Sequence, residues 1–394
     1  MSDHIINVGV VGLGVMGFDI AFLYAMSGCQ TLVHDASSNA MQAVLERRER
    51  TIERLKRRNR ISDQETAQVR EHLIPASDLA SLAQMDLITE AVSENGAVKR
   101  ELYRALGSAR FGGLLTTNTS SLTRATLLAD GAVDRRKFVL THFFNPVLFT
   151  RMIEVVKGDM DVADSDTVIS FLEKLGRNPV ETRDISGFVS NGILMVYAVM
   201  ALRLLERGAG IEAVDQAARE LRLLPPFLSF DSWKPSIIED VTRIMADLRG
   251  DRFLRSARLL TALAQDNPAF YIDQKPNRAI YQLAGAASHV DNAAIKSALK
   301  TSILIAAVRV AELGESPSTV DFVATEGIKV PAPPLKEVDT IGAESLLREL
   351  QKINDWLGDG DLAAPELLIA MADERQTFYK DDQPNPWIRL RLGL

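Results

Sequence analysis

The first half of the chain alternates short apolar runs with stretches of helical periodicity. The runs are rich in valine, leucine and isoleucine, which is typical of strands buried on both faces of a parallel sheet. The predicted strands are Val8–Val11, Thr31–His34, Met85–Val92, Leu114–Thr117, Phe138–Leu140, Met152–Val156 and Asn178–Thr182. Helical patterns lie between several of them, at Asn39–Arg70, Val98–Leu106 and Asp164–Leu175. This alternation predicts an open α/β sheet over residues 1–184.

The pattern changes at Asp184–Phe188, and from Asn191 onward it is helical with few strand signals. We therefore place a domain boundary after residue 184 and predict an all-α region behind it. Two parts of this region share an order of features: an acid after an apolar helix, an aspartate, a proline pair and a further aspartate. The matching residues are Glu206 and Glu312, Asp215 and Asp321, Pro225-Pro226 and Pro333-Pro334, and Asp231 and Asp339.

Chance similarity between helical hairpins is the alternative explanation, but the shared order favours duplication. Two related helical repeats are predicted, the first over 185–290 and the second over 291–394, with Arg278–Val290 as the join. The tail from Asp381 contains two prolines and two arginines and is predicted to be irregular.

Composition excludes several classes of protein. A length of 394 residues allows two or three domains, and a net charge of −7 argues against general nucleic-acid binding. The single cysteine, Cys29, excludes an internal disulfide and fits a reducing compartment. Because there is no apolar run of membrane-spanning length and no basic-then-apolar leader, we expect a cytoplasmic protein without membrane contact.

The first predicted strand runs into a glycine loop, Gly12-Leu13-Gly14-Val15-Met16-Gly17, and an apolar helical pattern follows it. This spacing between a strand and a helix suits a dinucleotide pyrophosphate. Gly12 makes the turn, Gly14 lets the backbone approach the phosphates, and Gly17 lets helix and strand pack closely. The N–H groups at the positive end of the helix then face the anion. The loop therefore predicts a Rossmann-type dinucleotide-binding domain.

Asp35 ends the second predicted strand, roughly twenty residues after the loop, where an acid receives the adenosine ribose hydroxyls. The alternative role is a loop acid that caps the next helix. A carboxylate at this position would repel a 2′-phosphate, so we expect NAD rather than NADP.

The helical pattern after Asp35 is strongly basic, with arginine or lysine at 47, 48, 50, 54, 56, 57, 58 and 60. Interleaved glutamates at 46, 49 and 53 favour a solvated helix face held by i,i+3 and i,i+4 pairs. A site for a phosphorylated part of the substrate is the alternative.

Polar residues crowd the ends of the later predicted strands, where ligands bind in an open α/β sheet. Asn118 and Ser120 follow one strand, and His142 and Asn145 follow another. Glu154 lies inside the next predicted strand, where burying a carboxylate is costly without a partner. A lone histidine is more often structural, but a histidine held by a carboxylate is a general acid/base pair suited to oxidising an alcohol beside nicotinamide. The histidines show no metal-ligand spacing, so we expect no metal.

Six pieces of sequence carry a resemblance to a known family. They are the glycine loop, Glu90–Asn95 with Lys99, Asn118–Leu122, His142–Val147, Glu154, and Gly187-Phe188 with Asn191. Together they make the chain similar to the L-3-hydroxyacyl-CoA dehydrogenase family. The histidine motif is specific to that family, whereas the glycine loop is shared with other hydroxyacid dehydrogenases.

The resemblance implies a role for each motif. His142 would be the catalytic base in the oxidising direction, with Glu154 as its orienting partner, and Ser120 and Asn191 would hold the substrate's 3-oxygen. Asn145 would contact substrate, and the basic helix would contact coenzyme A through positions such as Thr51 and Arg58. Contacts to NAD would come from Gly12, Gly14, Met16, Gly17, Asp35, Ala91, Glu94, Lys99 and Asn118.

The implied reaction interconverts a 3-hydroxyacyl thioester and the 3-ketoacyl thioester, carried on coenzyme A or on a carrier protein's phosphopantetheine arm. Relatives usually have a proline at Ser186, an arginine at Gly192 and a proline-methionine-glycine-proline segment at Leu223–Leu228, which borders the acyl pocket. These departures indicate a specialised acyl group. The alternatives are a dehydrogenase of a small free hydroxy acid or sugar acid, and a non-catalytic structural protein that binds a dinucleotide.

The helical region resembles the dehydrogenase part of multifunctional fatty-acid oxidation enzymes. Relatives with a single repeat dimerise through it, and in the duplicated form the second repeat takes the place of the partner. We therefore expect a monomer, with a homodimer as the alternative.

Overall fold

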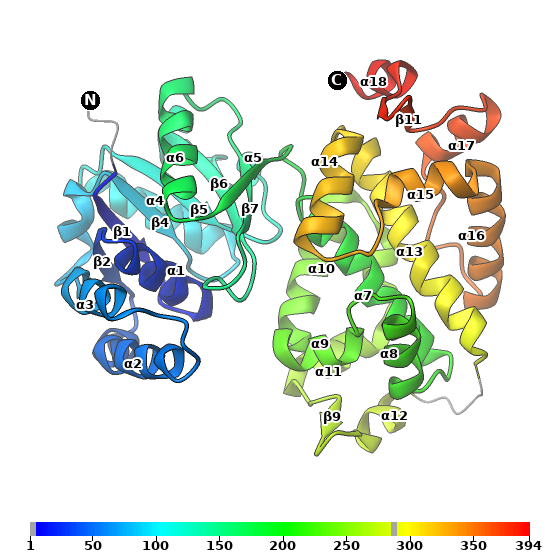
Figure 1. Cartoon of the computed structure of the whole chain (residues 1–394), viewed down its shortest axis with the longest axis horizontal. Coiled ribbons are helices and arrows are strands. Elements are labelled where there is room, and N and C mark those ends of the chain that lie inside the picture. The colour runs from blue at the N-terminus through cyan, green and yellow to red at the C-terminus, as the bar shows by residue number, and fades with distance from the viewer. Residues whose placement is uncertain (1–4, 285–289) are drawn as a thin grey trace. The chain divides into compact units, whose positions relative to one another are not determined.

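The computed structural model describes residues 5–284 and 290–394 of the chain. Contacts within the chain divide it into two compact units, residues 1–184 and 185–394, which are described separately (Figure 1). The first unit is an α/β domain and the second is helical, so the predicted fold class is confirmed. Among the described residues, no helix has the length and apolarity needed to cross a membrane.

In the described part of the first unit, eight strands form one sheet in the order β3-β2-β1-β4-β5-β6-β7-β8. Neighbouring strands are parallel except β6 and β7, which are antiparallel. The strands are β1 (Asn7–Val11), β2 (Gln30–His34), β3 (Leu73–Pro75), β4 (Leu87–Glu90), β5 (Leu114–Asn118), β6 (Phe138–Phe143), β7 (Met152–Val156) and β8 (Asn178–Glu181). Every predicted strand is present, and the short edge strand β3 was not predicted.

The helices of this unit are α1 (Val15–Met26), α2 (Ser38–Lys56), α3 (Asp63–His72), α4 (Gly96–Ser108), α5 (Arg124–Leu127) and α6 (Val162–Lys174), with 3-10 turns η1 (Leu79–Gln84) and η2 (Arg135–Lys137). The helical pattern predicted at 39–70 forms two helices, α2 and α3. The break comes at Ser62, which forms a capping box with Glu65 and starts α3. The hydroxyl of Ser62 accepts from the Glu65 amide, and the Glu65 carboxylate accepts from the Ser62 amide.

Alternation along the strands assigns each side chain to one of the two faces of the sheet. Tyr24 of α1 packs on Phe171 of α6 with ring centroids 5.2 Å apart, and both belong to the core on one face. Tyr103 of α4 packs on Phe138 at the start of β6, which marks the other face. His142 lies four residues after Phe138 and therefore points to the α4 face.

The helical unit is built around two long helices, α7 (Ser190–Glu206) and α13 (Asn292–Glu312), which are buried over most of their length and pack on each other. Helices that are apolar on all sides are typical of a buried core. Apart from the short turns η3 and η4, the remaining described elements follow each of these two helices in the same order. After α7 come α8 (Ile211–Glu220), α9 (Pro226–Trp233), α10 (Pro235–Arg249), η3 (Arg252–Arg255), α11 (Arg258–Asp266), β9 (Tyr271–Ile272), β10 (Lys275–Pro276) and α12 (Arg278–Ala284).

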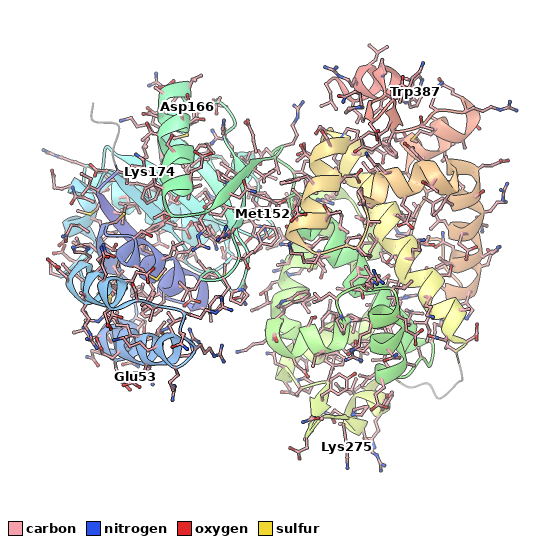
Figure 2. The ribbon with its side chains drawn as sticks, viewed as in Figure 1. Glu53, Met152, Asp166, Lys174, Lys275 and Trp387 are labelled. Carbon is pink, nitrogen blue, oxygen red and sulfur yellow. The ribbon has the colours of Figure 1, made fainter. Side chains whose placement is uncertain are left out.

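After α13 come α14 (Pro317–Phe322), the π-turn η4 (Val323–Gly327), α15 (Pro334–Ile341), α16 (Ala343–Leu357), α17 (Glu366–Asp373), β11 (Tyr379–Lys380), β12 (Gln383–Pro384) and α18 (Pro386–Leu392). Lys275 in the first hairpin and Trp387 in the last helix are labelled in Figure 2. The prediction of an irregular tail is wrong, because Asn385 caps α18 through a hydrogen bond to the Trp387 amide. The predicted join includes residues 285–289, which lie outside the described residues.

The acids that suggested an internal repeat make matching hydrogen bonds. Asp215 accepts from the Phe227 amide (2.9 Å) and the Tyr271 hydroxyl (2.9 Å). Asp321 accepts from the Leu335 amide (2.7 Å) and the Tyr379 hydroxyl (2.7 Å). Glu206 accepts from the Leu259 amide at the start of α11, and Glu312 accepts from the Leu367 amide at the start of α17. Asp231 and Asp339 accept from the amides of Phe270 and Phe378, which precede the two hairpins.

Candidate active site

The glycine loop joins β1 to α1 at the carboxyl edge of the sheet. Gly12 has φ +92°, and a Cβ there would lie 2.6 Å from the Ala91 carbonyl, while a Cβ at Gly17 would lie 1.8 Å from the Gly12 oxygen. A Cβ at Gly14 would meet no described protein atom within 4 Å. The loop is thus closed where β1, β4 and α1 pack and open at Gly14, where α1 begins. This open space beside the first amides of a twelve-residue helix fits a dinucleotide pyrophosphate.

Asp35 follows β2 and binds the glycine loop. Its Oδ2 accepts from the Leu13 amide at 2.6 Å, and its Oδ1 accepts from the Ser37 amide at 2.8 Å. Ser37 itself caps α2 through the Ala40 amide. Asp35 therefore fixes the loop, and its half-buried carboxylate lies at the strand end expected for the ribose contact. Met16 lies half-buried in the first turn of α1.

Arg47 of α2 also supports the loop, and sequence reasoning did not single it out. Its guanidinium donates to the carbonyls of Leu13 (2.8 Å) and Gly14 (3.1 Å) and lies 4.0 Å from the centroid of the Phe18 ring. The available signal was the basic stretch that contains Arg47.

The basic stretch forms surface ion pairs and also lines a hollow. Arg50 pairs with Glu46 at 3.3 Å and Arg70 with Glu49 at 2.6 Å, as expected of a solvated face. The same helix lines a hollow of about 600 Å³, whose walls are Val15, Asp19, Arg47, Arg50, Thr51, Glu53, Arg54 and Arg57. Thr51 is thus placed in a basic hollow beside the start of α1. Arg58 is exposed just after the end of α2.

Glu94 organises the loop that carries Ser120. Its Oε1 accepts from the Thr119 hydroxyl (2.6 Å), the Ser120 amide (2.8 Å) and both the amide and hydroxyl of Ser121 (2.8 Å each). Burial raises the pKa of Glu94, but the charge of Lys99 and these hydrogen bonds outweigh burial and hold the pKa below its usual range. Glu94 is therefore an anion that fixes the position of Ser120.

Lys99 lies beneath this loop, 0% exposed. Its ammonium donates to Glu90 Oε1 at 2.7 Å and to the carbonyl of Asn118 at 3.1 Å. Glu90 is also 0% exposed and accepts from the hydroxyls of Tyr103 (2.9 Å) and Thr117 (2.5 Å). This burial favours an indirect role for Lys99, through Asn118 and Glu94, over the direct contact with NAD that the resemblance implies.

Glu90 itself was missed as a site residue. The signal was available, because an acid inside an apolar strand needs a partner and Lys99 follows nine residues later. Glu90 Oε1 also accepts from the Val92 amide at 2.7 Å. The Ala91 amide donates to the Val11 carbonyl at 2.7 Å. Glu90 and Ala91 thus shape the end of β4 against the glycine loop.

His142 and Glu154 face each other across the antiparallel pair β6–β7. They are register partners, and His142 Nδ1 lies 2.9 Å from Glu154 Oε2. Glu154 is 0% exposed and His142 is 7% exposed. A buried carboxylate at Nδ1 favours the tautomer with the proton on Nδ1, which leaves the Nε2 lone pair on the other side of the ring as the base.

Asn118 ties the end of β5 to β6, since its side-chain oxygen accepts from the Phe143 amide at 3.1 Å. Asn145 is exposed in the loop after β6, next to a cis bond to Pro146. The structure thus brings the ends of β5 and β6 together, as predicted from the strand ends.

Asn191 belongs to the helical unit, in the first turn of α7. Packing explains why the next residue, Gly192, has no side chain. A Cβ at Gly192 would lie 2.6 Å from Cγ2 of Val310 and 3.2 Å from a guanidinium nitrogen of Arg249. The space in which a side chain at 192 would start is therefore filled by α13 and by Arg249.

The altered segment Leu223–Leu228 has a packing role at its centre. Phe227 is 0% exposed and stacks on Phe270 with ring centroids 4.8 Å apart. At the start of α9, the Phe227 amide donates to the carboxylate of Asp215. Phe227 is thus a core residue of the helical unit, whereas its neighbours Leu224 and Leu228 are exposed.

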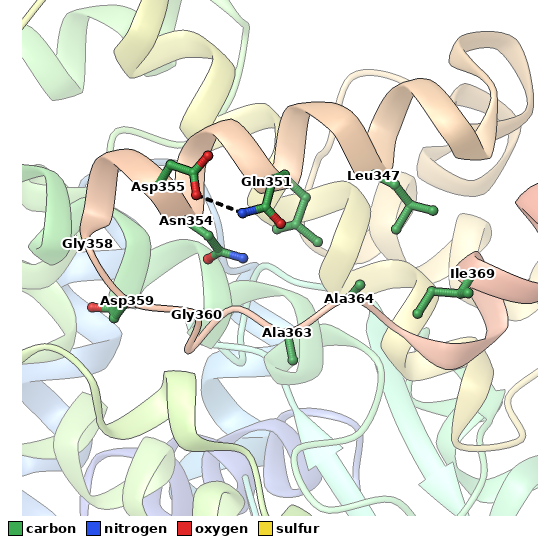
Figure 3. A pocket seen from close by; sticks show the side chains of 11 residues that line it. Leu347, Gln351, Asn354, Asp355, Gly358, Asp359, Gly360, Ala363, Ala364 and Ile369 are labelled. Atoms are coloured by element: carbon green, nitrogen blue, oxygen red, sulfur yellow. Dashed lines mark hydrogen bonds between the residues drawn. The ribbon is translucent and has the colours of Figure 1, made fainter.

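A further hollow of about 680 Å³ in the helical unit lies between α16 and the segment that follows it (Figure 3). Gln351 and Asp355 hydrogen-bond at 2.7 Å along its α16 wall, and Ala363, Ala364 and Ile369 form the other wall. None of the residues that line this hollow is one of the site residues predicted from the sequence.

Comparisons with known proteins agree with these features. Residues 7–185 match the model of the 3-hydroxyacyl-CoA dehydrogenase NAD-binding domain, and residues 187–281 match that of the family's C-terminal domain. A probable 3-hydroxybutyryl-CoA dehydrogenase of Deinococcus radiodurans is 34% identical over 211 residues, covering 52% of this chain and 75% of that protein.

The fatty acid oxidation complex subunit alpha of Pseudomonas putida is 30% identical over 55% of this chain, which spans only 30% of that longer protein. A crystal structure of 3-hydroxybutyryl-CoA dehydrogenase from Escherichia coli shares the fold, with a TM-score of 0.77 and 20% identity over 95% of this chain and 100% of that one. The chain therefore belongs to the 3-hydroxyacyl-CoA dehydrogenase family, as an oxidoreductase of CH–OH groups whose cofactor is NAD.

Proposed function

We propose that the chain interconverts a 3-hydroxyacyl thioester and the 3-ketoacyl thioester, with His142 and Glu154 as the general acid/base pair. The observation that carries this proposal is the 2.9 Å contact between His142 Nδ1 and Glu154 Oε2 at the carboxyl edge of an NAD-binding sheet. A histidine with one nitrogen held by a buried carboxylate has the other available for the proton of the substrate's 3-hydroxyl.

In the oxidising direction, His142 Nε2 takes the proton of the 3-hydroxyl as C3 loses a hydride and becomes a carbonyl. NAD, when bound, supplies the hydride acceptor. Glu154 stabilises the imidazolium that forms and keeps the ring in one orientation. Ser120, fixed by Glu94, and Asn191 would hydrogen-bond the 3-oxygen, which carries increasing negative charge as its proton leaves. In the reducing direction His142 returns the proton to the oxygen.

NAD recognition in this proposal includes the carboxylate of Asp35. We expect Asp35→Ser to weaken NADH binding roughly ten- to a hundredfold, because charge-assisted hydrogen bonds contribute about 1.5–3 kcal/mol. We also expect NADPH binding to improve, since the repulsion of the 2′-phosphate is removed. Fluorescence titration of both cofactors measures this.

Asp35→Asn is the matched variant, because it keeps the shape of the side chain and removes the charge. It should improve NADPH binding while disturbing the Leu13 contact less than the serine does. A wild-type protein that already prefers NADPH would contradict the role of Asp35.

For the carrier, we propose coenzyme A. The support is the hollow on α2, which is lined by Arg47, Arg50, Arg54 and Arg57 against two acids, Asp19 and Glu53; the exposed Arg58 follows in sequence. Guanidinium groups are suited to bidentate binding of phosphates. Acetoacetyl-CoA, acetoacetate on a phosphopantetheinylated carrier protein, and free acetoacetate distinguish the options in an NADH-oxidation assay. Turnover of the free acid alone would favour the alternative dehydrogenase and overturn the thioester.

We also propose that the helical unit consists of two related repeats that replace a dimer. Arg203 of α7 pairs with Asp359 after α16, and Arg309 of α13 pairs with Asp251 after α10 at 2.9 Å. Each pair joins the same two positions with the repeats exchanged, which is how contacts repeat across a two-fold dimer interface. We also propose a cytoplasmic location, which the single cysteine supports because it allows no internal disulfide.

A fused interface of this kind predicts a monomer in solution. Size-exclusion chromatography with light scattering should give the mass of one chain across a wide concentration range. A stable dimer of two chains at low concentration would contradict the proposal, because α13 already covers α7 within each chain.

A further inference from the structure

We propose that Arg249 is a positioning residue, which holds the turn that carries Asn191 and so sets the place of that side chain in the reaction. The inference rests on the proposed function, in which Asn191 hydrogen-bonds the substrate's 3-oxygen.

The turn before α7 has an unusual backbone. Gly187 has φ +81°, and Phe188, which is 1% exposed, has φ +54°. A bulky residue with left-handed φ is strained, and such a conformation persists only when its surroundings hold it. The Phe188 amide donates to the Ile185 carbonyl at 2.8 Å, and the Gly192 amide donates to the Gly187 carbonyl at 3.0 Å. The turn thus leads directly into the first residues of α7.

Arg249 holds this turn from the end of α10. One guanidinium nitrogen donates to the Ser186 carbonyl and lies 3.4 Å from the Phe188 carbonyl. The two carbonyls flank Gly187, so the guanidinium bridges the strained part of the turn. Hydrogen bonds from a charged donor are about twice as strong as neutral ones. Burial lowers the pKa of Arg249 to about 10, which leaves it protonated at neutral pH.

Gly192 provides the room for this contact. A Cβ at 192 would be 3.2 Å from the nearer guanidinium nitrogen, tighter than ordinary packing. A larger residue directly after Asn191 would therefore crowd the guanidinium of Arg249 at the place where it contacts the turn.

The second half of the helical unit supplies an internal control. Helices α10 and α16 have fifteen residues each, and each is followed by a left-handed glycine, Gly250 or Gly358. The last helical residue is Arg249 in α10 but Leu357 in α16, and Leu357 is 0% exposed. The helix start that corresponds to the turn is also ordinary there, because Asp291 caps α13 with φ −62°. A buried leucine is thus sufficient for packing at this position in the second half. The arginine occurs only in the half that has the strained turn.

The experiment compares Arg249→Leu, the residue of the second half, with wild type in acetoacetyl-CoA reduction. We expect kcat to fall roughly tenfold or more, because small displacements of a positioned group are costly, while the KM for NADH is unchanged. Arg249→Lys keeps a charged donor and should restore part of the lost kcat. Arg255→Ala is the control, because Arg255 is exposed and the second half has Ala363 at that position.

A double-mutant cycle separates positioning from a general loss of structure. In an Asn191→Ala background, Arg249→Leu should change kcat less than twofold, because the side chain that it positions is gone. An equal fall in kcat in both backgrounds, or wild-type kcat in Arg249→Leu, would overturn the inference. If Arg249→Leu does not fold, Arg249→Lys is used for the same cycle. A wild-type protein that turns over no thioester would instead contradict the proposed function.

Discussion

His142→Gln is expected to lower kcat by on the order of a hundredfold or more while leaving NADH binding nearly intact. Glutamine keeps a polar side chain of similar reach but cannot take up the proton of the 3-hydroxyl. The glycine loop lies at the ends of β1, β2 and β4, whereas His142 lies on β6, so the affinity of the protein for NADH should not change. Steady-state reduction of acetoacetyl-CoA gives kcat, and fluorescence titration gives the affinity for NADH.

Two further variants sharpen this prediction. Glu154→Gln should lower kcat as well, because the imidazolium loses its buried counter-charge at 2.9 Å. His72→Gln is the control, since His72 lies at the end of α3, away from the strand ends that carry the site. Wild-type kcat in His142→Gln would remove the histidine from the mechanism.

Lys99→Met is expected to destabilise the first unit by about 3–5 kcal/mol, the usual cost of removing one partner of a buried ion pair. Methionine has a similar length and leaves Glu90, 0% exposed, without its cation. Because the chain has two units, it can show two unfolding transitions in denaturant. The transition that moves to higher denaturant when NADH is added belongs to the cofactor-binding unit, and its free energy of unfolding is measured.

Matched variants test the cause of this loss. Glu90→Gln in the Lys99→Met background should recover part of the stability, because no uncompensated charge then remains buried. Lys56→Met, which removes an exposed pair with Asp63, should leave the transition almost unchanged. A Lys99→Met protein as stable as wild type would mean that Glu90 is neutralised by other groups.

The features that the sequence predicted well are those with a local signature. Strands with buried β-branched runs, the glycine loop and the acid inside β7 all stand out in short windows. The partnership of His142 with Glu154 was inferred from the cost of burying an acid without a partner, from the strand-end position of His142 and from the family resemblance. Their direct opposition depends on the antiparallel register of β6 and β7, which no local pattern specifies.

The features that were missed depend on contacts between distant segments. Glu94 was predicted as an NAD contact, but its role in holding Thr119, Ser120 and Ser121 was missed, because these partners lie more than twenty residues away. Arg47 reaches Leu13 from the next helix, and Arg249 reaches Ser186 from another. The tail shows the opposite error, since prolines suggested irregular chain where Pro386 begins a helix.

The most direct test of the account is the fate of the hydride. The measurement is reduction of acetoacetyl-CoA with NADH deuterated at C4 of the nicotinamide ring, followed by mass spectrometry of the product. Hydride transfer to C3 with His142 as the acid predicts 3-hydroxybutyryl-CoA carrying a single deuterium at C3, formed at least a hundredfold more slowly by His142→Gln. Absence of deuterium at C3, or label transferred only to a free oxo acid, would contradict it.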